Sequence, residues 1–234
     1  MAAAYTLRLG RIWALAAALL IPAKNLEANP LGANVVGGSA TVQGSGTSTV
    51  TVTQSSQRAI INWQNFDIKE GELTQFIQPD RSATVLNRVT GDVNPTQILG
   101  TLSANGQVFV VNPNGILIGN GAVVNTAGFV ATTHDVANGD FMAGRYDFTI
   151  AGKASASVVN LGMITASHAG FAALVAPGVR NAGTITARFG KVALASGQGF
   201  SLDLYGDNLI KLAVGETVAD QVIDVATGER MSNL

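Results

Sequence analysis

The side chains best suited to chemistry in this sequence are His134 and Asp135, because an imidazole beside a carboxylate is typical of metal sites and of acid–base catalysis. The only other histidine, His168, lies far along the chain, and without cysteine no ligand set has the usual spacing of a metal site. A serine-histidine-aspartate triad can assemble from distant positions, but no serine is singled out here. Asn138-Gly139-Asp140 is typical of a turn, since a calcium site needs more acidic neighbours. The sequence predicts no catalytic residue, no metal site and no cofactor.

Composition favours many short strands over amphipathic helices. Of 234 residues, 47% are hydrophobic and 12% are charged, and 27 glycines supply frequent turn positions. The net charge is −1 and no lysine or arginine cluster stands out, which argues against a nucleic-acid partner. Because cysteine is absent, no disulfide can stabilise an exported form of the chain.

The N-terminus is typical of an export signal. A short basic region precedes a ten-residue apolar run at residues 12–21. This run is too short to span a bilayer core of about 30 Å, so it predicts a signal peptide over residues 1–28; the alternative is a buried N-terminal helix. Ala23 and Ala28 are the two candidate cleavage positions, and cleavage after Ala28 would leave Asn29 as the first residue.

The stretch Asn112-Pro113-Asn114-Gly115-Ile116 is the most informative in the chain, and it lies between two β-rich apolar runs, residues 108–111 and 116–118. Proline fixes φ at about −65°, and the Asn-Gly pair accepts a left-handed position at little steric cost. The pattern predicts strand, tight corner and strand. Asparagine at such a corner sets the turn more often than it contacts a partner, so a fold role for Asn112 and Asn114 is favoured over recognition, and the two roles are compatible.

Two strings recur at nearly constant spacing and indicate a repetitive fold. Residues 160–166 recur at 181–187, twenty-one positions on, and residues 170–176 recur at 190–196, twenty positions on. Short strands and Asn/Gly corners with a period near twenty are typical of a parallel β-helix, whose coils stack about 4.8 Å apart. A barrel or a sandwich would tolerate the strand content but would not explain the period. The sequence predicts an all-β solenoid of on the order of eight to ten coils.

Two polar segments, residues 79–97 and 132–156, interrupt the repeat and predict hairpins packed on the side of the coils. Valine alternates with polar residues in the opening segment, which predicts an N-terminal β cap at about residues 29–60 that hides the first edge. No terminal cap is evident after the last strands. Residues 29–234 are therefore expected to form one domain that continues in a longer parent protein; the alternative is a short protein with an unrecognised cap.

An ordered series of motifs runs along the chain. Its parts are Ile60-Ile61-Asn62-Trp63-Gln64-Asn65-Phe66-Asp67-Ile68, Leu86-Asn87-Arg88-Val89-Thr90-Gly91, Ile98-Leu99-Gly100-Thr101-Leu102, the stretch Asn112-Pro113-Asn114-Gly115-Ile116, and Asn125-Thr126-Ala127-Gly128-Phe129-Val130-Ala131-Thr132-Thr133. This series resembles the secretion domain of two-partner-secretion exoproteins, the filamentous-haemagglutinin-like adhesins, and especially the high-molecular-weight non-pilus adhesins. The resemblance covers roughly residues 29–215.

The chain departs from the family pattern at one place. Many relatives carry a second Asn-Pro-Asn-type motif upstream, whereas this chain has the proline-free string that contains Asn62, Trp63, Asn65 and Phe66. These four residues are secondary recognition candidates, with packing in the first coils favoured for Trp63 and Phe66.

The resemblance implies a right-handed parallel β-helix with an N-terminal cap and side hairpins. It also implies a secreted or surface-exposed protein of a Gram-negative bacterium, which passes the inner membrane by the general secretory machinery and the outer membrane by a two-partner transporter with periplasmic receptor domains. The domain would act as secretion signal and as nucleus for folding, with no catalysis. Asn112, Pro113, Asn114, Gly115 and Ile116 would form the recognition and fold motif. Host-cell contact is expected only through the parent protein.

Two other functions remain open on the sequence. A carbohydrate-active β-helix enzyme needs clustered carboxylates, but the acidic residues are scattered and residues 156–200 contain none. A domain that itself binds a host receptor is the other alternative, and binding of the purified domain to cells or glycans would favour it.

Overall fold

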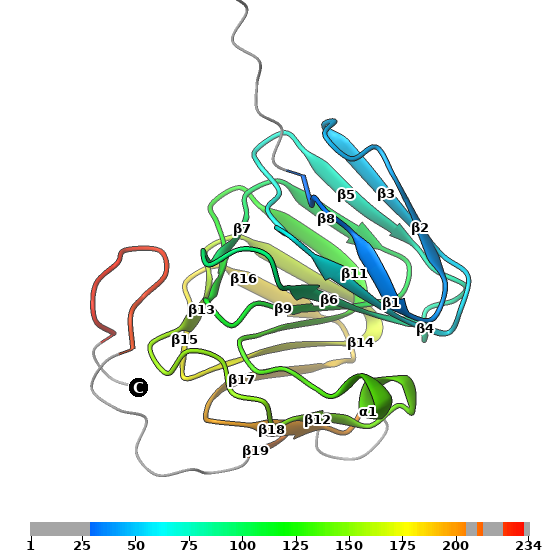
Figure 1. Ribbon diagram of the computed structural model, residues 1–234. Helices are drawn as coiled ribbons and strands as arrows, with labels where there is room; N and C mark the ends of the chain where they lie inside the picture. Colours follow the sequence, from blue (N-terminus) through cyan, green and yellow to red (C-terminus); the bar gives the residue numbers. More distant parts are fainter. Residues whose placement is uncertain (1–28, 205–209, 213–221, 232–234) are drawn as a thin grey trace, which may run out of the picture.

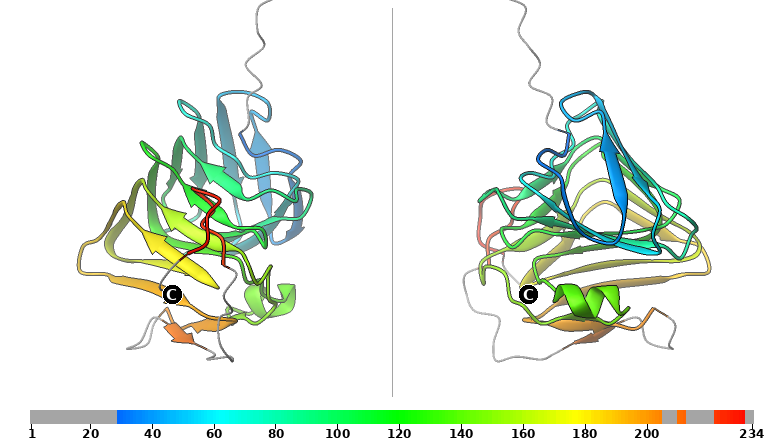
Figure 2. Two further views of the ribbon diagram at one scale, coloured as in Figure 1. Left: turned by 90° about the vertical axis from the view of Figure 1, so that its left-hand side faces the viewer. Right: turned by 45° about the vertical axis from the view of Figure 1, so that its right-hand side comes forward.

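The computed structural model describes residues 29–204, 210–212 and 222–231, and in these ranges the chain forms nineteen strands and one short helix. The strands stack into coils (Figure 1), and the end view outlines a triangle (Figure 2, right). Each side of the triangle is built from parallel strands of successive coils, and we name these sides face 1, face 2 and face 3.

Faces 1 and 2 form one continuous sheet because two long strands, β11 (Val123–Thr132) and β14 (Met163–Ala176), bend across the corner between them. Face 1 also contains β4 (Arg58–Trp63), β6 (Thr84–Val89), β9 (Gln107–Val111) and β17 (Lys191–Ser196). Face 2 also contains β3 (Thr49–Gln54), β5 (Leu73–Ile77), β8 (Thr101–Ala104) and β16 (Thr184–Ala187). Face 3 consists of β7 (Thr96–Ile98), β10 (Ile116–Ile118), β13 (Ser157–Asn160) and β15 (Gly178–Asn181).

The strand registers confirm the repeat in the sequence. Ser157 pairs with Gly178, twenty-one positions on, and Phe171 pairs with Lys191, twenty positions on. The described residues complete about six coils, so the expectation of eight to ten is wrong. The first coils are longer than the last ones, since Leu73 pairs with Thr101, twenty-eight positions on. Of the second expected excursion, residues 132–156, all but Thr132 at the end of β11 lie outside the coils.

The excursion expected at residues 79–97 is wrong as well. This segment contains β6, which pairs in parallel with β4 and β9, and β7, which pairs in parallel with β10. Three of its four charged residues, Asp80, Arg81 and Asp92, lie at the corners on either side of β6, and Arg88 lies within the strand. Within the strand, buried Asn87 accepts a hydrogen bond from the Trp63 indole (2.9 Å), so the polar side chain is satisfied inside the solenoid.

The interior is filled by columns of side chains that run from coil to coil. On face 1, large Phe129 pairs with small Ala172, and such alternation lets successive layers interlock. The column ends at Val192, which is 48% exposed because no further coil covers it in the described part of the chain. The column reads Ala59, Val85, Val108, Phe129, Ala172 and Val192.

The N-terminal end of the solenoid is closed on all three sides. The antiparallel strands β1 (Asn34–Gly37) and β2 (Ala40–Gln43) pair with β4 and β3, and Leu31 bridges to Asn65 on the remaining side. Fully buried Asn29 donates to the Thr47 carbonyl (2.8 Å) and accepts from the Thr74 hydroxyl (2.9 Å). Covered edges cannot pair with another chain.

The N-terminal cap predicted from the sequence is longer than the antiparallel cap in the structure. Of the expected cap range 29–60, the antiparallel strands occupy residues 34–43, whereas β3 and β4 are already strands of the first coil. The predicted signal peptide, residues 1–28, lies outside the described residues.

A second layer covers face 1. Residues 132–156 include α1 (Asn138–Met142) and β12 (Tyr146–Phe148), which pairs antiparallel with β18 (Phe200–Leu202), itself paired with β19 (Ile210–Leu212). Phe109 of β9 lies at the centre of this contact. Its ring centroid is 5.3–6.2 Å from four aromatic rings: Phe141, Tyr146, Phe148 and Phe171. The helix has five residues, and no helix among the described residues is long and apolar enough to cross a membrane.

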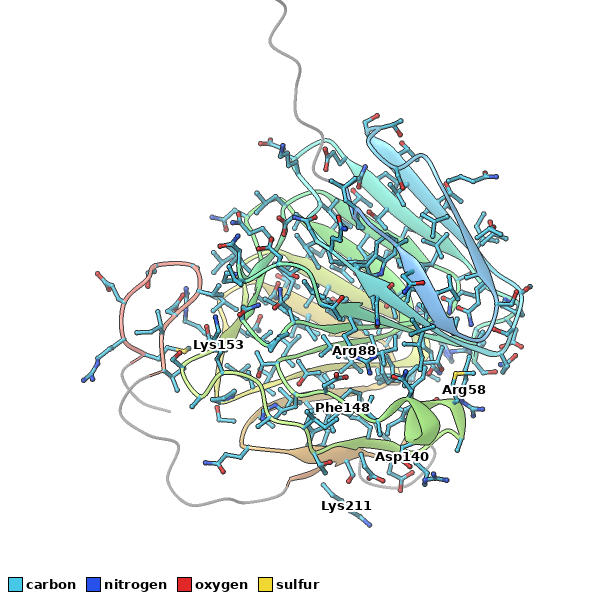
Figure 3. The ribbon with its side chains drawn as sticks, viewed as in Figure 1. Arg58, Arg88, Asp140, Phe148, Lys153 and Lys211 are labelled. Carbon is cyan, nitrogen blue, oxygen red and sulfur yellow. The ribbon has the colours of Figure 1, made fainter. Side chains whose placement is uncertain are left out.

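Two arginines of face 1 attach this layer to the coils, and Figure 3 labels both. The Arg58 Nε donates to the Tyr146 hydroxyl (3.3 Å). Arg88 donates to the Val136 carbonyl (2.9 Å) and to the Asn138 side chain (2.9 Å), so one largely buried cation fixes the start of the second layer.

Glycines let the coils approach at the corner between face 3 and face 2. A Cβ added at Gly162 would lie 2.6 Å from the Gly119 carbonyl oxygen and 2.8 Å from the Ala122 carbonyl oxygen. Because these neighbours are backbone atoms held in the sheet, they cannot rotate away as a flexible side chain would.

Gly162→Ala is therefore expected to lower the free energy of unfolding by about 1–3 kcal/mol through this overpacking. Urea denaturation of purified protein measures the change. Gly139→Ala in α1 is the matched control, since nothing lies within 4 Å of its added Cβ. An equal loss in both variants would contradict backbone contact as the cause.

Candidate recognition site

The motif Asn112-Pro113-Asn114-Gly115-Ile116 forms the corner between β9 on face 1 and β10 on face 3. Asn112 is 1% exposed, and its Nδ2 donates to the Asn94 carbonyl and to the Thr96 hydroxyl, both at 3.0 Å. Its Oδ1 accepts from the backbone N–H of Asn114 (2.9 Å), and the Gly115 N–H closes the turn on the Asn112 carbonyl (3.1 Å). Asn112 thus fixes the corner from within, as the sequence favoured.

The rest of the motif divides into buried and accessible residues. Gly115 has φ +121°, a conformation that disfavours a side chain, and Ile116 is fully buried in the solenoid core. Pro113 and Asn114 are half-buried, and Asn114 Nδ2 donates to the Asp92 carbonyl (3.2 Å). Only these two motif side chains present surface to a partner.

Both accessible residues line a cleft of about 410 Å³ between the motif corner and the second layer. One wall carries an ion pair between Arg88 Nε and Asp135 Oδ2 (2.7 Å), with the Arg88 side chain 12% exposed. The other walls include Asp92 and Ile150, which is 51% exposed. The cleft therefore combines an apolar contact with a preorganised pair of charges.

The secondary candidates do not form a surface. Trp63 is fully buried, and Phe66 is 1% exposed with its ring edge-on to the indole at 5.6 Å. Asn65 donates to Asp67 Oδ2 (2.7 Å), and Asn62 accepts from Arg88 (3.3 Å), so both half-buried asparagines bond within the fold. Burial raises the pKa of the Asp67 carboxyl, and hydrogen bonds from Gln97 and Asn65 offset part of that effect.

The residues that suggested catalysis have other partners. Asp135 pairs with Arg88, Asp140 pairs with Arg145 (2.6 Å), and His134 is 1% exposed beneath the second layer. Among the described residues, no three histidine, cysteine, aspartate or glutamate side chains gather as a metal-binding group.

Sequence reasoning did not assign Arg88, Asp92, Asp135 or Ile150 to the site. The one sequence feature that could have pointed to these residues is the position of Arg88 within one of the motifs that resemble the family. The cleft joins three segments far apart in the sequence, so spacing alone does not predict it.

The fold and this corner define a class of protein. Residues 27–233 match the family described as TPS secretion domain, and the chain belongs to that family. Membership implies an outer-membrane two-partner transporter as partner and secretion from a Gram-negative cell.

Particular relatives are heme/hemopexin-binding proteins of Haemophilus influenzae. The chain is 36% identical over 202 residues to a heme/hemopexin-binding protein of strain ATCC 51907 / DSM 11121 / KW20 / Rd, covering 83% of this chain and 22% of the relative. A second heme/hemopexin-binding protein is 40% identical over 112 residues, covering 48% of this chain and 12% of that protein. The chain thus spans about a fifth or less of the length of these relatives.

Two solved structures share the fold. The crystal structure of the HMW1 secretion domain from Haemophilus influenzae has a TM-score of 0.71 and 37% identity, over 82% of this chain and 50% of that chain. The crystal structure of a filamentous hemagglutinin secretion domain has a TM-score of 0.58 and 19% identity, over 80% and 69% of the two chains, and this likeness shows the fold alone.

Asn112→Ala should lower the free energy of unfolding by about 1–3 kcal/mol, because it leaves buried hydrogen-bond partners unsatisfied, whereas Asn114→Ala should cost less than about 1 kcal/mol at its half-exposed position. Chemical denaturation of both variants measures the difference. A larger loss in Asn114→Ala would contradict the structural assignment of Asn112.

His134 predicts a pH dependence of stability. Burial lowers its pKa below the ordinary 6.5, and a hydrogen bond with the Gln198 backbone offsets part of the shift. As pH falls below 6.5, the unfolded chain binds a proton before the folded chain does, so stability decreases until the folded-state pKa is passed.

Denaturation midpoints measured from about pH 7.5 to 5 should show this slope in the wild type, and His134→Gln should flatten it. The exposed His168 gives the matched control, because His168→Gln should retain the slope. The same slope in His134→Gln would show that other groups cause it.

Proposed function

We propose that this domain is the secretion signal recognised by the periplasmic receptor domains of the outer-membrane transporter, and that the cleft beside the motif corner is the contact surface. The observation that carries the proposal is the selective exposure of Pro113 and Asn114, which both line that cleft. The buried motif residues Asn112, Gly115 and Ile116 would act by fixing the shape of the corner.

The chemistry of the cleft supports a protein partner. Exposed Ile150 offers apolar area, and the Arg88–Asp135 pair is held by further bonds from Arg88 to the second layer. Because these charged side chains are already ordered, they can orient a partner without a further loss of side-chain entropy on binding. We infer no catalytic step, since the Asp135 carboxylate is engaged by Arg88 and the Asp92 carboxylate accepts hydrogen bonds from Asn94.

The route of export completes the proposal. Residues 1–28 would direct the chain to the general secretory machinery, and the domain would meet the transporter in the periplasm before release to the medium or the cell surface.

Val192 and Leu194 face the uncovered end of the last described coil, at 48% and 47% exposure, and later coils of a longer parent could stack there as folding proceeds. Host-cell contact would lie in such later parts. The heme or hemopexin binding in the names of the relatives is a property of much longer proteins, of which this chain covers 22% in the first case.

Ile150→Ser should reduce transporter-dependent secretion about fivefold, because truncating a central interface contact costs about 1 kcal/mol or more. The chain is expressed with and without its transporter, and mature protein is quantified in the medium and the periplasm. Release that is equal without the transporter would overturn the proposed function.

Ile77→Ser is the matched control, since Ile77 on face 2 is 46% exposed and lies away from the cleft lining. It should secrete like the wild type. Equal secretion of Ile150→Ser, with its fold intact by circular dichroism, would reject the cleft as the contact surface while leaving the family function in place.

A further inference from the structure

A second surface lies at the corner between face 2 and face 1 of the last coils. Here Ala169 and Phe189 occupy equivalent positions, each two residues before the register pair Phe171 and Lys191, and both have positive φ (56° and 54°). The Ala169 N–H donates to the Arg188 carbonyl (2.8 Å), which stacks the two corners. Left-handed positions favour glycine or asparagine, and a bulky aromatic residue there is an outlier that marks a functional candidate.

The fold itself does not account for the phenylalanine. Phe189 is 76% exposed, so it contributes little to the core, and its backbone conformation adds strain. Glycine at this position would satisfy the corner geometry at lower cost. The side chain is therefore better explained by an external contact.

The Arg188 guanidinium and the His168 imidazole both lie beside the exposed ring. The Arg188 guanidinium carbon lies 5.4 Å from the Phe189 ring centroid, and the His168 ring centroid lies 5.1 Å away. Arg81, which lies at the corner between β5 and β6, donates a hydrogen bond to the His168 carbonyl (2.5 Å). Within the described ranges, the ion pairs involve Arg88, Arg145 and Arg180, but neither Arg81 nor Arg188. The nearby Asp80 carboxylate accepts from Ser82 and Gln57.

A cleft of about 260 Å³ lies beside this cluster and shares Arg81 with it. Ala169, which follows His168, also lines the cleft, and Phe171 and Leu204 form apolar parts of its lining. The volume lies slightly below that of pockets for drug-sized ligands, about 300–1,000 Å³, and suits a group the size of one sugar ring. The site therefore combines an exposed aromatic ring, two guanidinium groups that form no ion pair with a carboxylate of the described residues, and a small cleft.

We propose that this surface, the Phe189 corner (Arg81, His168, Arg188 and Phe189), binds an acidic sugar with a carboxylate on a pyranose ring. The carboxylate pairs with a guanidinium fork, and the C–H face of the ring packs on Phe189. An acidic peptide would satisfy the cations but leave the aromatic face uncovered, and a neutral sugar would leave the guanidinium groups unpaired. The site does not depend on transporter recognition, because its residues lie on a different corner from Pro113 and Asn114.

The test is calorimetric titration of the purified chain with an oligogalacturonate, its neutral methyl ester and a polyglutamate of equal charge. The oligogalacturonate should bind, and the two comparison ligands should bind about tenfold more weakly, as expected when a charge-assisted or aromatic contact is lost. Absence of oligogalacturonate binding, or equal binding of polyglutamate, would overturn the proposal.

Arg188→Ala and Phe189→Ala should each weaken the affinity for oligogalacturonate about tenfold. Arg145→Ala and Val93→Ala are matched controls for an exposed arginine and for an apolar residue that is 77% exposed, and they should bind like the wild type. Unchanged affinity in Phe189→Ala would reject the aromatic contact.

Phe189→Gly separates binding from folding, because it should raise the thermal midpoint by removing strain while it lowers affinity. A lowered midpoint would show that Phe189 serves the fold and would overturn the argument. Transporter-dependent secretion of Phe189→Ala should equal that of the wild type, so this result and the secretion test can fail independently.

Discussion

The structure depends on the stacking of one coil on the next through parallel backbone hydrogen bonds on three faces. A repeat of about 4.8 Å leaves no room for side chains where corner backbones meet, which places glycines such as Gly162 against neighbouring carbonyls. The same stacking aligns interior side chains into columns, so each coil completes the core of the previous one. Stacking also creates two ends, and only the first is closed in the described chain, by β1, β2 and buried Asn29.

The second layer buries the outer surface of face 1. This surface needs a cover because face 1 has apolar side chains on its outside as well as its inside. Phe109 and its aromatic neighbours are removed from water by α1, β12 and β18. A layer joined only by apolar contacts could slide along a regular sheet. Arg88 prevents this by bonding to specific groups at its start, Asp135 and the Val136 carbonyl, and a cation that is 12% exposed requires such partners.

Local chemistry explains which features could be predicted from sequence. The recurrence of residues 160–166 and 170–176 fixed the register of the last coils, and Pro113 with Gly115 gave the corner. Composition could not distinguish the polar segment 79–97, which stays in the coils, from 132–156, which leaves them. That difference depends on distant partners, since Asn87 is satisfied by Trp63 from the preceding coil. The cleft was unpredictable for the same reason, because its walls come from three separate segments.

In the proposed recognition, the motif corner would act largely through its geometry. A partner cannot touch Asn112 while the corner is folded, because the side chain is buried and its amide is bonded to Asn94 and Thr96. Any influence of Asn112 on recognition must therefore pass through the placement of Pro113 and Asn114. These two residues reach the cleft wall only if β9 and β10 hold their register, and that register depends on coils above and below. A transporter that binds this corner would therefore recognise the folded state of the surrounding coils. A linear peptide with the same five residues would not present that surface.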